Sequence, residues 1–314
     1  MAKALIPALG WRLAQAGMVA ILVGILSFLM MSTLPGDMIY RIAGARFGYD
    51  NVTAENAEII RAQLGDPSSI TAFASWITGL FRGDLGVSLV TGEAISAEIA
   101  HQFGATAQLA AVAIALSILI GPPLGLWAGL TPGSLLDRTV VTLAAVFKSI
   151  PQFLLGLVLI VVVAIGMGLL PAAGHGEVRH MVLPGVTLAL GLSASTTRIT
   201  REAVVQARGS EWWRFARWKG LSDRQVMLRH GLRHVSVPLL TLIAAQFVAL
   251  MEGIVVVETI FGWPGIGHAL VHAVFHRDVP MVQGTALVMG LSFVLVNALA
   301  DIAARILDPR EVAR

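Results

Sequence analysis

Charged side chains stand inside otherwise apolar runs of this sequence. Lys148 and Glu252 each lie in a stretch with the length and hydrophobicity of a membrane-spanning helix, and Glu258 lies near the end of one. A charge inside a membrane is costly, so such residues usually face a water-filled cavity or the interior of a helix bundle. We therefore take Lys148 and Glu252 as candidates for the lining of a solute path. For Glu258 we favour a structural role, in which it caps the backbone of the turn at residues 261–267.

Other kinds of site chemistry are poorly represented. The GxxxxGK[ST] pattern that cradles ATP phosphates is missing, so the chain cannot hold ATP by that route. Cysteine is absent, which excludes disulfides, a thiol nucleophile and a cysteine-based metal site. His175 and His180 flank Glu177 and could form a weak metal site, but we favour solvated loop histidines. We predict no catalytic residue, no cofactor and no metal. The histidines expected on the external side are His101, His175, His180, His268, His272 and His276.

The segment 202–238 is the most informative part of the chain. Its spacing predicts a helix in which Trp212, Phe215, Ala216 and Lys219 share one face. Trp213 and Trp218 add to its aromatic content. Gly220 then permits a left-handed turn, followed by Leu221. Ser222 can cap a second helix that begins at Asp223, because Gln225 stands three residues later as in a capping box.

Two interpretations of this segment stay open on pattern alone. A short amphipathic helix, a glycine turn and a basic helix could form a docking element for another protein. The same residues could instead anchor an interfacial helix among lipid headgroups through tryptophan and arginine.

Composition identifies the class of protein that must position these residues. The chain has 314 residues, of which 56% are hydrophobic and 13% charged, and its mean hydropathy is +0.78. Soluble domains are roughly 25% charged, so we expect an all-α membrane protein. The net charge of +3 does not indicate nucleic-acid binding, because the basic residues cluster at the ends of apolar segments.

Six membrane spans are predicted from runs without charge, since roughly 20 apolar residues cross a bilayer. The first is read as a retained span and not a cleaved signal. Pro122 and Pro123 inside the second span are read as static kinks, and Pro151 inside the third as a bend that shapes a cavity. The spans lie at about residues 12–37, 105–130, 139–170, 182–201, 235–260 and 285–305.

Lysine and arginine placement predicts the orientation. They gather at the N-terminus, between spans four and five, and at the C-terminus, which puts both termini in the cytoplasm. The acidic segment 35–102 is then external, with a helix at 54–64 capped by Thr53 and an apolar stretch at 72–80 along the membrane surface. The predicted regions are 1–34 with the first span, 35–102 outside, 103–306 as a five-helix core with a cytoplasmic loop at 202–234, and the tail 307–314.

Several motifs resemble one known family. Residues 213–222 (WRFARWKGLS), 226–233 (VMLRHGLR) and 238–241 (PLLT) resemble the coupling loop of dipeptide/oligopeptide/nickel-type ABC importer permeases. Further segments are similar to that family's other motifs, in the same order along nearly the whole chain. They are 83–88 (GDLGVS), 149–153 (SIPQF), 257–267 (VETIFGWPGIG), 277–283 (RDVPMVQ) and 307–310 (LDPR).

The resemblance implies a type I ABC importer permease fold in a bacterial cytoplasmic membrane. It implies two separate ATP-binding subunits, a second homologous permease subunit and an extracytoplasmic solute-binding protein, and no nucleic acid. It assigns ATPase coupling to Trp212, Trp213, Phe215, Ala216, Lys219, Gly220, Leu221, Ser222 and Asp223. Gln152, in the motif at the third-span bend, joins Lys148 and Glu252 as a candidate for the translocation path.

The chain departs from the importer pattern at three places, one of which is Lys148 before the Ser-Ile-Pro bend. Arg214, Phe215 and Ala216 replace a Glu-Ala-Ala sequence, which removes an acidic docking contact, and Glu252 stands where the family often has glycine. The solute predicted from the resemblance is a peptide or a metal or metal-chelate complex, with an opine-like molecule also open. The alternative function is an ion-coupled secondary transporter or channel, which would need no docking loop.

Overall fold

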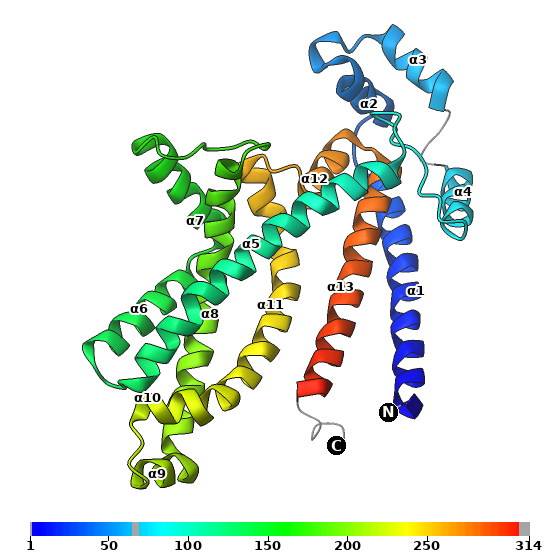
Figure 1. The fold of residues 1–314 in the computed structure, drawn as a ribbon. Coiled ribbons are helices and arrows are strands. Elements are labelled where there is room, and N and C mark those ends of the chain that lie inside the picture. Colours follow the sequence, from blue (N-terminus) through cyan, green and yellow to red (C-terminus); the bar gives the residue numbers. More distant parts are fainter. Residues whose placement is uncertain (1, 65–68, 308–314) are drawn as a thin grey trace. The chain divides into compact units, whose positions relative to one another are not determined.

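A computed structural model describes residues 2–64 and 69–307, and these residues form an all-helical chain without a named strand. Helices α1 to α5 are followed by a broken pair, a long α8, two short helices and three further helices (Figure 1). Their bounds are α1 Ala2–Thr33, α2 Met38–Phe47, η1 Tyr49–Asn51, α3 Ala54–Leu64, α4 Ile70–Leu80, α5 Ile95–Leu130, α6 Leu135–Ser149, α7 Gln152–Leu159, η2 Ile160–Gly166, α8 Val178–Gly209, α9 Glu211–Trp218, α10 Asp223–Val226, η3 Met227–Gly231, α11 Leu232–Phe261, α12 Ile266–His276 and α13 Val279–Leu307.

The apolar helices fit a membrane protein. Among the described residues, three helices are long and apolar enough to cross a bilayer: Gly10–Met30, Ile95–Leu130 and Val279–Leu299. If each of two further pairs of helices, interrupted by a bend, is one span, the described residues have up to five. The predicted span at 182–201 lies in α8, which is long enough to cross but less apolar. The all-helical membrane fold predicted from the sequence is confirmed.

The bend predicted at Pro151 is present. Helix α6 and the combined α7 and η2 meet at 102° across residues 150–151. Proline has no N–H to donate to the hydrogen bonds of a helix, and its ring clashes with the preceding turn. The helix therefore breaks at Pro151, between Ser149 and Gln152. Pro122 and Pro123, by contrast, lie inside α5, which continues through them to Leu130.

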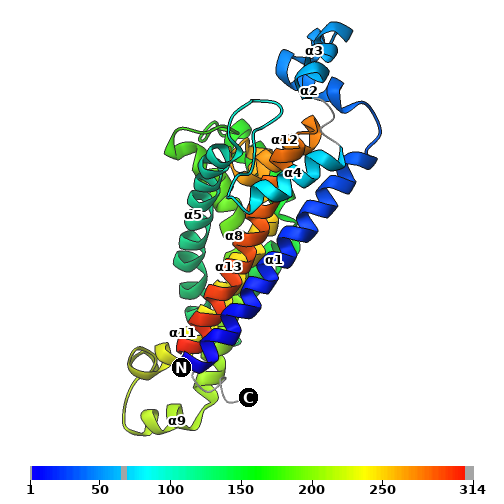
Figure 2. The same cartoon turned by 90° about the vertical axis from the view of Figure 1, so that its right-hand side faces the viewer.

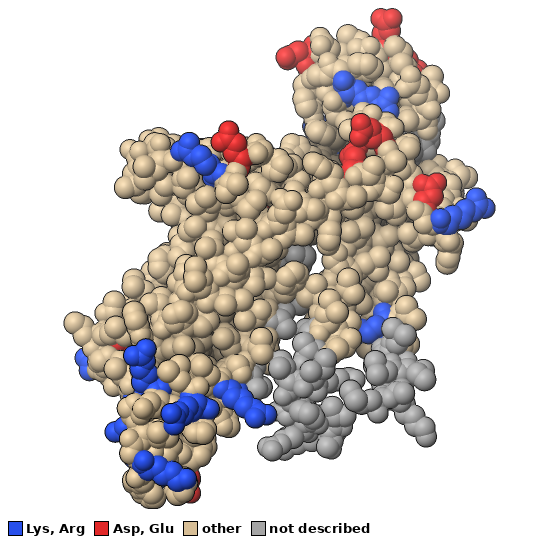
Figure 3. Space-filling model, viewed as in Figure 1, with Lys and Arg blue, Asp and Glu red and all other residues tan. Residues whose placement is uncertain are grey.

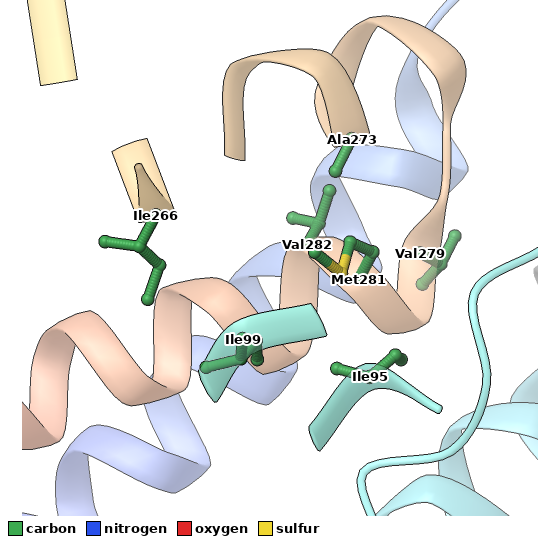
Figure 4. Close-up of a cluster of buried hydrophobic side chains, with 7 residues drawn as sticks. All are labelled: Ile95, Ile99, Ile266, Ala273, Val279, Met281 and Val282. Carbon is green, nitrogen blue, oxygen red and sulfur yellow. The ribbon is translucent and has the colours of Figure 1, made fainter. Parts of the chain in front are cut away.

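The chain divides into two compact units, of which the first contains Met1–Thr106 and Pro264–Leu295. In this unit α1 runs beside α13 (Figure 2), and Val19 approaches Gly290 closely. The start of α5, one face of α12 and the start of α13 share one apolar core (Figure 4). Its buried members are Ile95, Ile99, Ile266, Ala273, Val279, Met281 and Val282.

The two helices predicted in segment 35–102 are present in the first unit. Helix α3 spans Ala54–Leu64, and the Thr53 hydroxyl accepts the amide of Asn56 at 3.2 Å, which confirms the predicted cap. The apolar stretch at 72–80 is helix α4, which packs on α1 through Phe28 and Phe73, with ring centroids 4.8 Å apart.

Two charged residues fasten this segment to the turn before α13. The Asp278 carboxylate accepts the Ser88 hydroxyl at 2.5 Å and the Leu89 amide at 3.1 Å. Arg277 donates to the carbonyls of Pro35 and Gly36. Hydrogen bonds to charged groups are stronger than neutral ones, so these contacts hold the loops of the first unit on its core.

The second unit contains Ala107–Trp263 and Val296–Arg314, and α8 is its central helix. Helix α8 packs against α6, α7 and α11, and Figure 1 shows α8 and α11 side by side. Because neighbouring helices cover it, α8 can carry hydroxyl side chains inside the bundle, which explains why its hydropathy is lower than that of the other spans. The buried ones are Thr187, Ser193, Thr196, Thr197 and Thr200.

Close packing of α5 on α8 depends on glycine. A Cβ at Gly125 would lie 2.5 Å from the Thr197 carbonyl oxygen and 2.7 Å from the Thr200 Cβ. Gly121 and Gly129, one turn away on either side, approach Thr196 and Val204 as closely. Small residues let membrane helices approach each other in this way.

We expect Gly125→Ala to lower the free energy of unfolding by about 1–3 kcal/mol, the usual effect of overpacking. Thermal unfolding of the purified chain in detergent measures this. The matched control is Gly104→Ala in the same helix, where a Cβ would meet nothing within 4 Å. Equal melting temperatures for the two variants would show that the contact between α5 and α8 is looser than described.

Candidate coupling site and translocation path

Local sequence signals build the element formed by α9, α10 and the turn between them, which we call the coupling element (residues 210–226). The Ser210 hydroxyl caps α9 by accepting the Trp213 amide. Gly220 has φ of +86°, a conformation that disfavours any residue with a Cβ. Ser222 and Gln225 form a reciprocal capping box, in which the Gln225 side chain accepts the Ser222 amide at 2.8 Å. The glycine turn and the capping box predicted from the sequence are therefore confirmed.

Buried side chains fix the coupling element on its own unit. Trp213 and Ala216 lie in a core with Val204 of α8 and Val226 of α10. Trp213 is only 3% exposed, so of the two adjacent tryptophans it is the one that anchors the element. Both residues were assigned to ATPase coupling, and Trp213 can serve that role only by holding the element in place.

Between α9 and the residues of η3 and α11 that face it lies an open groove of about 330 Å³, which we call the coupling groove. Its aromatic parts are paired: Trp212 stacks on His234 with centroids 4.8 Å apart, and Lys219 Nζ lies 4.5 Å from the Phe215 ring centroid. The four residues predicted to share one helical face all border this groove. Its full lining is Trp212, Phe215, Ala216, Lys219, Leu221, His230 and His234.

Asp223 is turned toward its own element. Its carboxylate accepts the Trp213 indole N–H at 3.4 Å, and its oxygens lie 3.3 Å from nitrogens of Arg208 and of Arg217. Arg208 also donates to the carbonyl of Leu130, the last residue of α5. The carboxylate thus joins the coupling element to the ends of α5 and α8. The sequence did not reveal Arg208 and Arg217 as partners of Asp223, because the chain must first fold back at Gly220.

Basic side chains surround the coupling element. Figure 3 shows lysine and arginine gathered over the part of the second unit that holds α9 and α10. The exposed members of this region include Arg214, Arg217, Lys219 and Arg229. An exposed groove with a basic border fits an acidic protein surface or anionic headgroups.

The three candidates for the translocation path have different surroundings. Gln152, at the start of α7, lies between α8 and α11: a Cβ on Gly253 would come within 2.0 Å of its Oε1, and one on Gly191 within 3.4 Å of its Nε2. Lys148 is exposed in the last turn of α6. Glu252 belongs to α11 and directly precedes Gly253, but its side chain lies outside the described residues.

One further polar residue between α8 and α11, Gln246, was not predicted from the sequence. Gln246 of α11 is 6% exposed, and its amide donates to the Leu192 carbonyl of α8 at 2.8 Å. A glutamine in an apolar run gives no signal by itself. Its role becomes visible only when α8 and α11 are adjacent, where interhelical hydrogen bonds stabilise membrane helices.

Glu258, in the last turn of α11, and His175, in the segment before α8, both contact Trp263. Glu258 is fully buried, and its backbone carbonyl accepts the Trp263 amide at 2.8 Å; capping by its side chain stays a prediction. His175 is exposed, but it is more than a solvated loop residue, because its ring contacts Trp263 edge-on at 4.7 Å. Within residues 2–64 and 69–307, no three His, Cys, Asp or Glu side chains gather as a metal-binding group.

Comparison with known proteins identifies the class. Residues 121–312 match the family described as binding-protein-dependent transport system inner membrane component. The chain belongs to this family and is a permease component of a bacterial-type ABC importer, embedded in the membrane.

Individual relatives match nearly the whole chain, and one solved transporter shares its fold. The chain is 37% identical over 308 residues to a protein of Brucella abortus (strain 2308) that is named a peptide transport system permease protein, and the match covers 95% of this chain and 96% of the relative. It is 34% identical over 290 residues to the glutathione transport system permease protein GsiC of Salmonella typhimurium (strain LT2), with 92% and 93% covered. The inward-facing MetNI methionine ABC transporter shares the fold at 16% identity, with a TM-score of 0.56 over 67% of this chain and 96% of that chain.

Proposed function

We propose that this chain forms half of the translocation path of an ATP-driven importer and receives its driving force through the coupling groove. Two ATP-binding subunits, a second homologous permease and an extracytoplasmic solute-binding protein complete the assembly. The observation that carries the proposal is the coupling groove, an exposed aromatic surface on an element that is itself anchored by Trp213 and Asp223.

The contacts support a rigid lever. Asp223 and Arg208 connect the coupling element to the end of α5, and the core around Trp213 connects it to α8. Movement of a partner in the groove would therefore be passed to two long helices and would not be absorbed by a loose loop. Such rigid-body switching between packed arrangements is a common form of conformational change.

The solute is best sought among short peptides. The relatives reported above carry peptide or glutathione transport in their names, and a peptide was one of the solutes predicted from the sequence; the metal chelate stays a prediction. Gln152, with the polar groups near it on α8 and α11, is the proposed part of the path that meets the solute. With both termini and the coupling groove in the cytoplasm, segment 35–102 would face the binding protein.

Co-purification tests the proposal. The chain, expressed together with its neighbouring transporter genes and purified in detergent, is expected to bring two ATPase subunits with it. We expect Phe215→Asp, in the groove, to lose them, because a carboxylate replaces an exposed aromatic contact.

Trp218→Asp is the matched control. Trp218 lies on the same short helix and is 82% exposed, but it does not line the groove. It should keep the ATPases. Purification of the wild-type chain without any ATPase would contradict the proposal and favour the ion-coupled transporter or channel.

A further inference from the structure

Helix α12 carries three histidines spaced one turn apart. His268, His272 and His276 follow each other at i, i+4 and i+8 and so lie on one face. Their ring centroids are 4.4 Å apart for His268 and His272, and 5.6 Å apart for His272 and His276. His272 is exposed, and His268 and His276 are half-buried. The three histidines can therefore be reached from the surface of the protein.

The spacing suits chelation of a metal ion. With a metal–nitrogen distance of about 2.0–2.1 Å, two imidazoles on one tetrahedral ion have centroids about 5 Å apart. Both neighbouring pairs lie within about 0.6 Å of this value, and the choice of His272 and His276 comes from the pocket that these two residues line. Two histidines at i and i+4 of a helix recur in zinc sites because the turn brings both rings to the same point.

Helix α12 presents this pair rigidly. Ala273, between the two histidines, is buried in the core that α12 shares with α5 and α13 (Figure 4). Asp278 follows the helix and is held by Ser88 and Leu89. The pair is therefore fixed at both its back and its C-terminal end, which lowers the entropic cost of binding an ion between the two rings.

A small chamber of about 120 Å³ adjoins the same two rings. It is lined by His272 and His276 together with Glu98 and Gln102 of α5. The Gln102 Oε1 atom is buried and has no hydrogen-bond partner among the described residues. Glu98 contributes a negative charge and accepts the Thr91 hydroxyl. An ion with a bound water in this chamber would supply the missing donor and balance the carboxylate.

We propose that His272 and His276 chelate a divalent transition-metal ion, of the zinc or nickel type, at the mouth of this chamber. Imidazole nitrogens favour these ions over magnesium and calcium, which prefer oxygen ligands. With two protein ligands, the remaining positions are filled by water or by a donor of a passing solute.

Zinc titration of the full-length chain in lipid nanodiscs tests this site. The chain is purified with a tag that contains no histidine, and zinc binding is followed by calorimetry and by competition with a chromophoric chelator. We expect one ion per chain. His272→Ala and His276→Ala should each weaken binding at least about tenfold, since even loss of a residue behind a ligand costs that much. Zinc should also raise the melting temperature of the wild-type chain but not that of His272→Ala.

Two other histidines serve as controls. His101 is exposed on α5 and does not line the chamber, so His101→Ala should bind zinc like the wild type, as should His268→Ala. Metal-free melting temperatures equal to that of the wild type show that the variants fold. If His272→Ala binds zinc as tightly as the wild type, the proposed site is wrong. If His268→Ala loses zinc binding and His276→Ala keeps it, the ligands are His268 and His272 and the assigned pair is wrong.

Discussion

Replacing Asp137 with alanine is expected to lower the free energy of unfolding by about 3 kcal/mol, because the change leaves Arg201 without its partner. The two side chains form a bidentate pair, with Arg201 Nε 2.5 Å from Oδ1 and Nη2 2.9 Å from Oδ2 of Asp137. Asp137 is 3% exposed, and its carboxylate also accepts the Gly133 amide at 2.8 Å. The pair joins the first turn of α6 to the C-terminal third of α8, so its loss loosens two helices of the second unit.

Thermal unfolding in detergent measures this effect, with an expected decrease of about 4–5 °C in the melting temperature for a chain of this size. The matched control is Glu202→Ala, which removes the partner of Arg198 from an exposed pair on the same helix. Exposed pairs contribute about 0–1 kcal/mol, so this variant should melt close to the wild type. If Asp137→Ala melts as close to the wild type as Glu202→Ala does, the ion pair between Asp137 and Arg201 is absent in the membrane-embedded chain.

Substituting Gly220 with tryptophan is expected to separate ATP hydrolysis from transport. The residue has φ of +86° and open space around it, so the indole fits but projects from the coupling element beside the groove. The left-handed backbone adds about 1–2 kcal/mol of strain for a residue with a side chain. If docking of the ATPase subunits loses only about 1.4 kcal/mol, their affinity for the coupling groove falls tenfold. We therefore expect uptake of a radiolabelled dipeptide or of labelled glutathione to fall at least about tenfold. ATP hydrolysis by the assembled complex should persist.

Gly133→Trp provides the control for backbone strain. Gly133 has φ of +80° and also faces open space, but it lies in the turn between α5 and α6. Its variant should pay the same conformational cost and keep uptake and hydrolysis coupled. If Gly220→Trp still couples transport to ATP hydrolysis, measured in proteoliposomes at equal protein levels, the coupling element does not transmit the movement of the ATPases.

The parts of the coupling element that were predicted correctly arise from residues close together in the chain. Ser222 and Gln225 are three residues apart, and the turn at Gly220 needs only the absence of a Cβ. The helix over 54–64 and its Thr53 cap have the same local origin. Trp212 and Trp213 show the limit: both were assigned to coupling, yet one borders the groove while the other is buried in the core beneath it.

The translocation path was less accessible to sequence reasoning. Charges inside apolar runs drew attention to Lys148 and Glu252, but the contacts converge on Gln152 between two glycines of α8 and α11. Gln246 gave no signal at all, since an uncharged amide barely changes the hydropathy of a span. The contact of Gln152 with Gly191 and Gly253 can be inferred only once α7, α8 and α11 are known to be neighbours.

The sequence alone determined that this chain is a helical membrane protein, where most of its spans lie, and which turns and caps shape its coupling element. These features depend on hydrophobicity and on hydrogen bonds within a few residues, which are written directly in the order of amino acids. Only the tertiary structure decided that Asp137 pairs with Arg201, that Asp223 gathers Arg208 and Arg217, and that α8 is enclosed by other helices. Those contacts join residues far apart in the chain, and they form only when packed helices bring the side chains together.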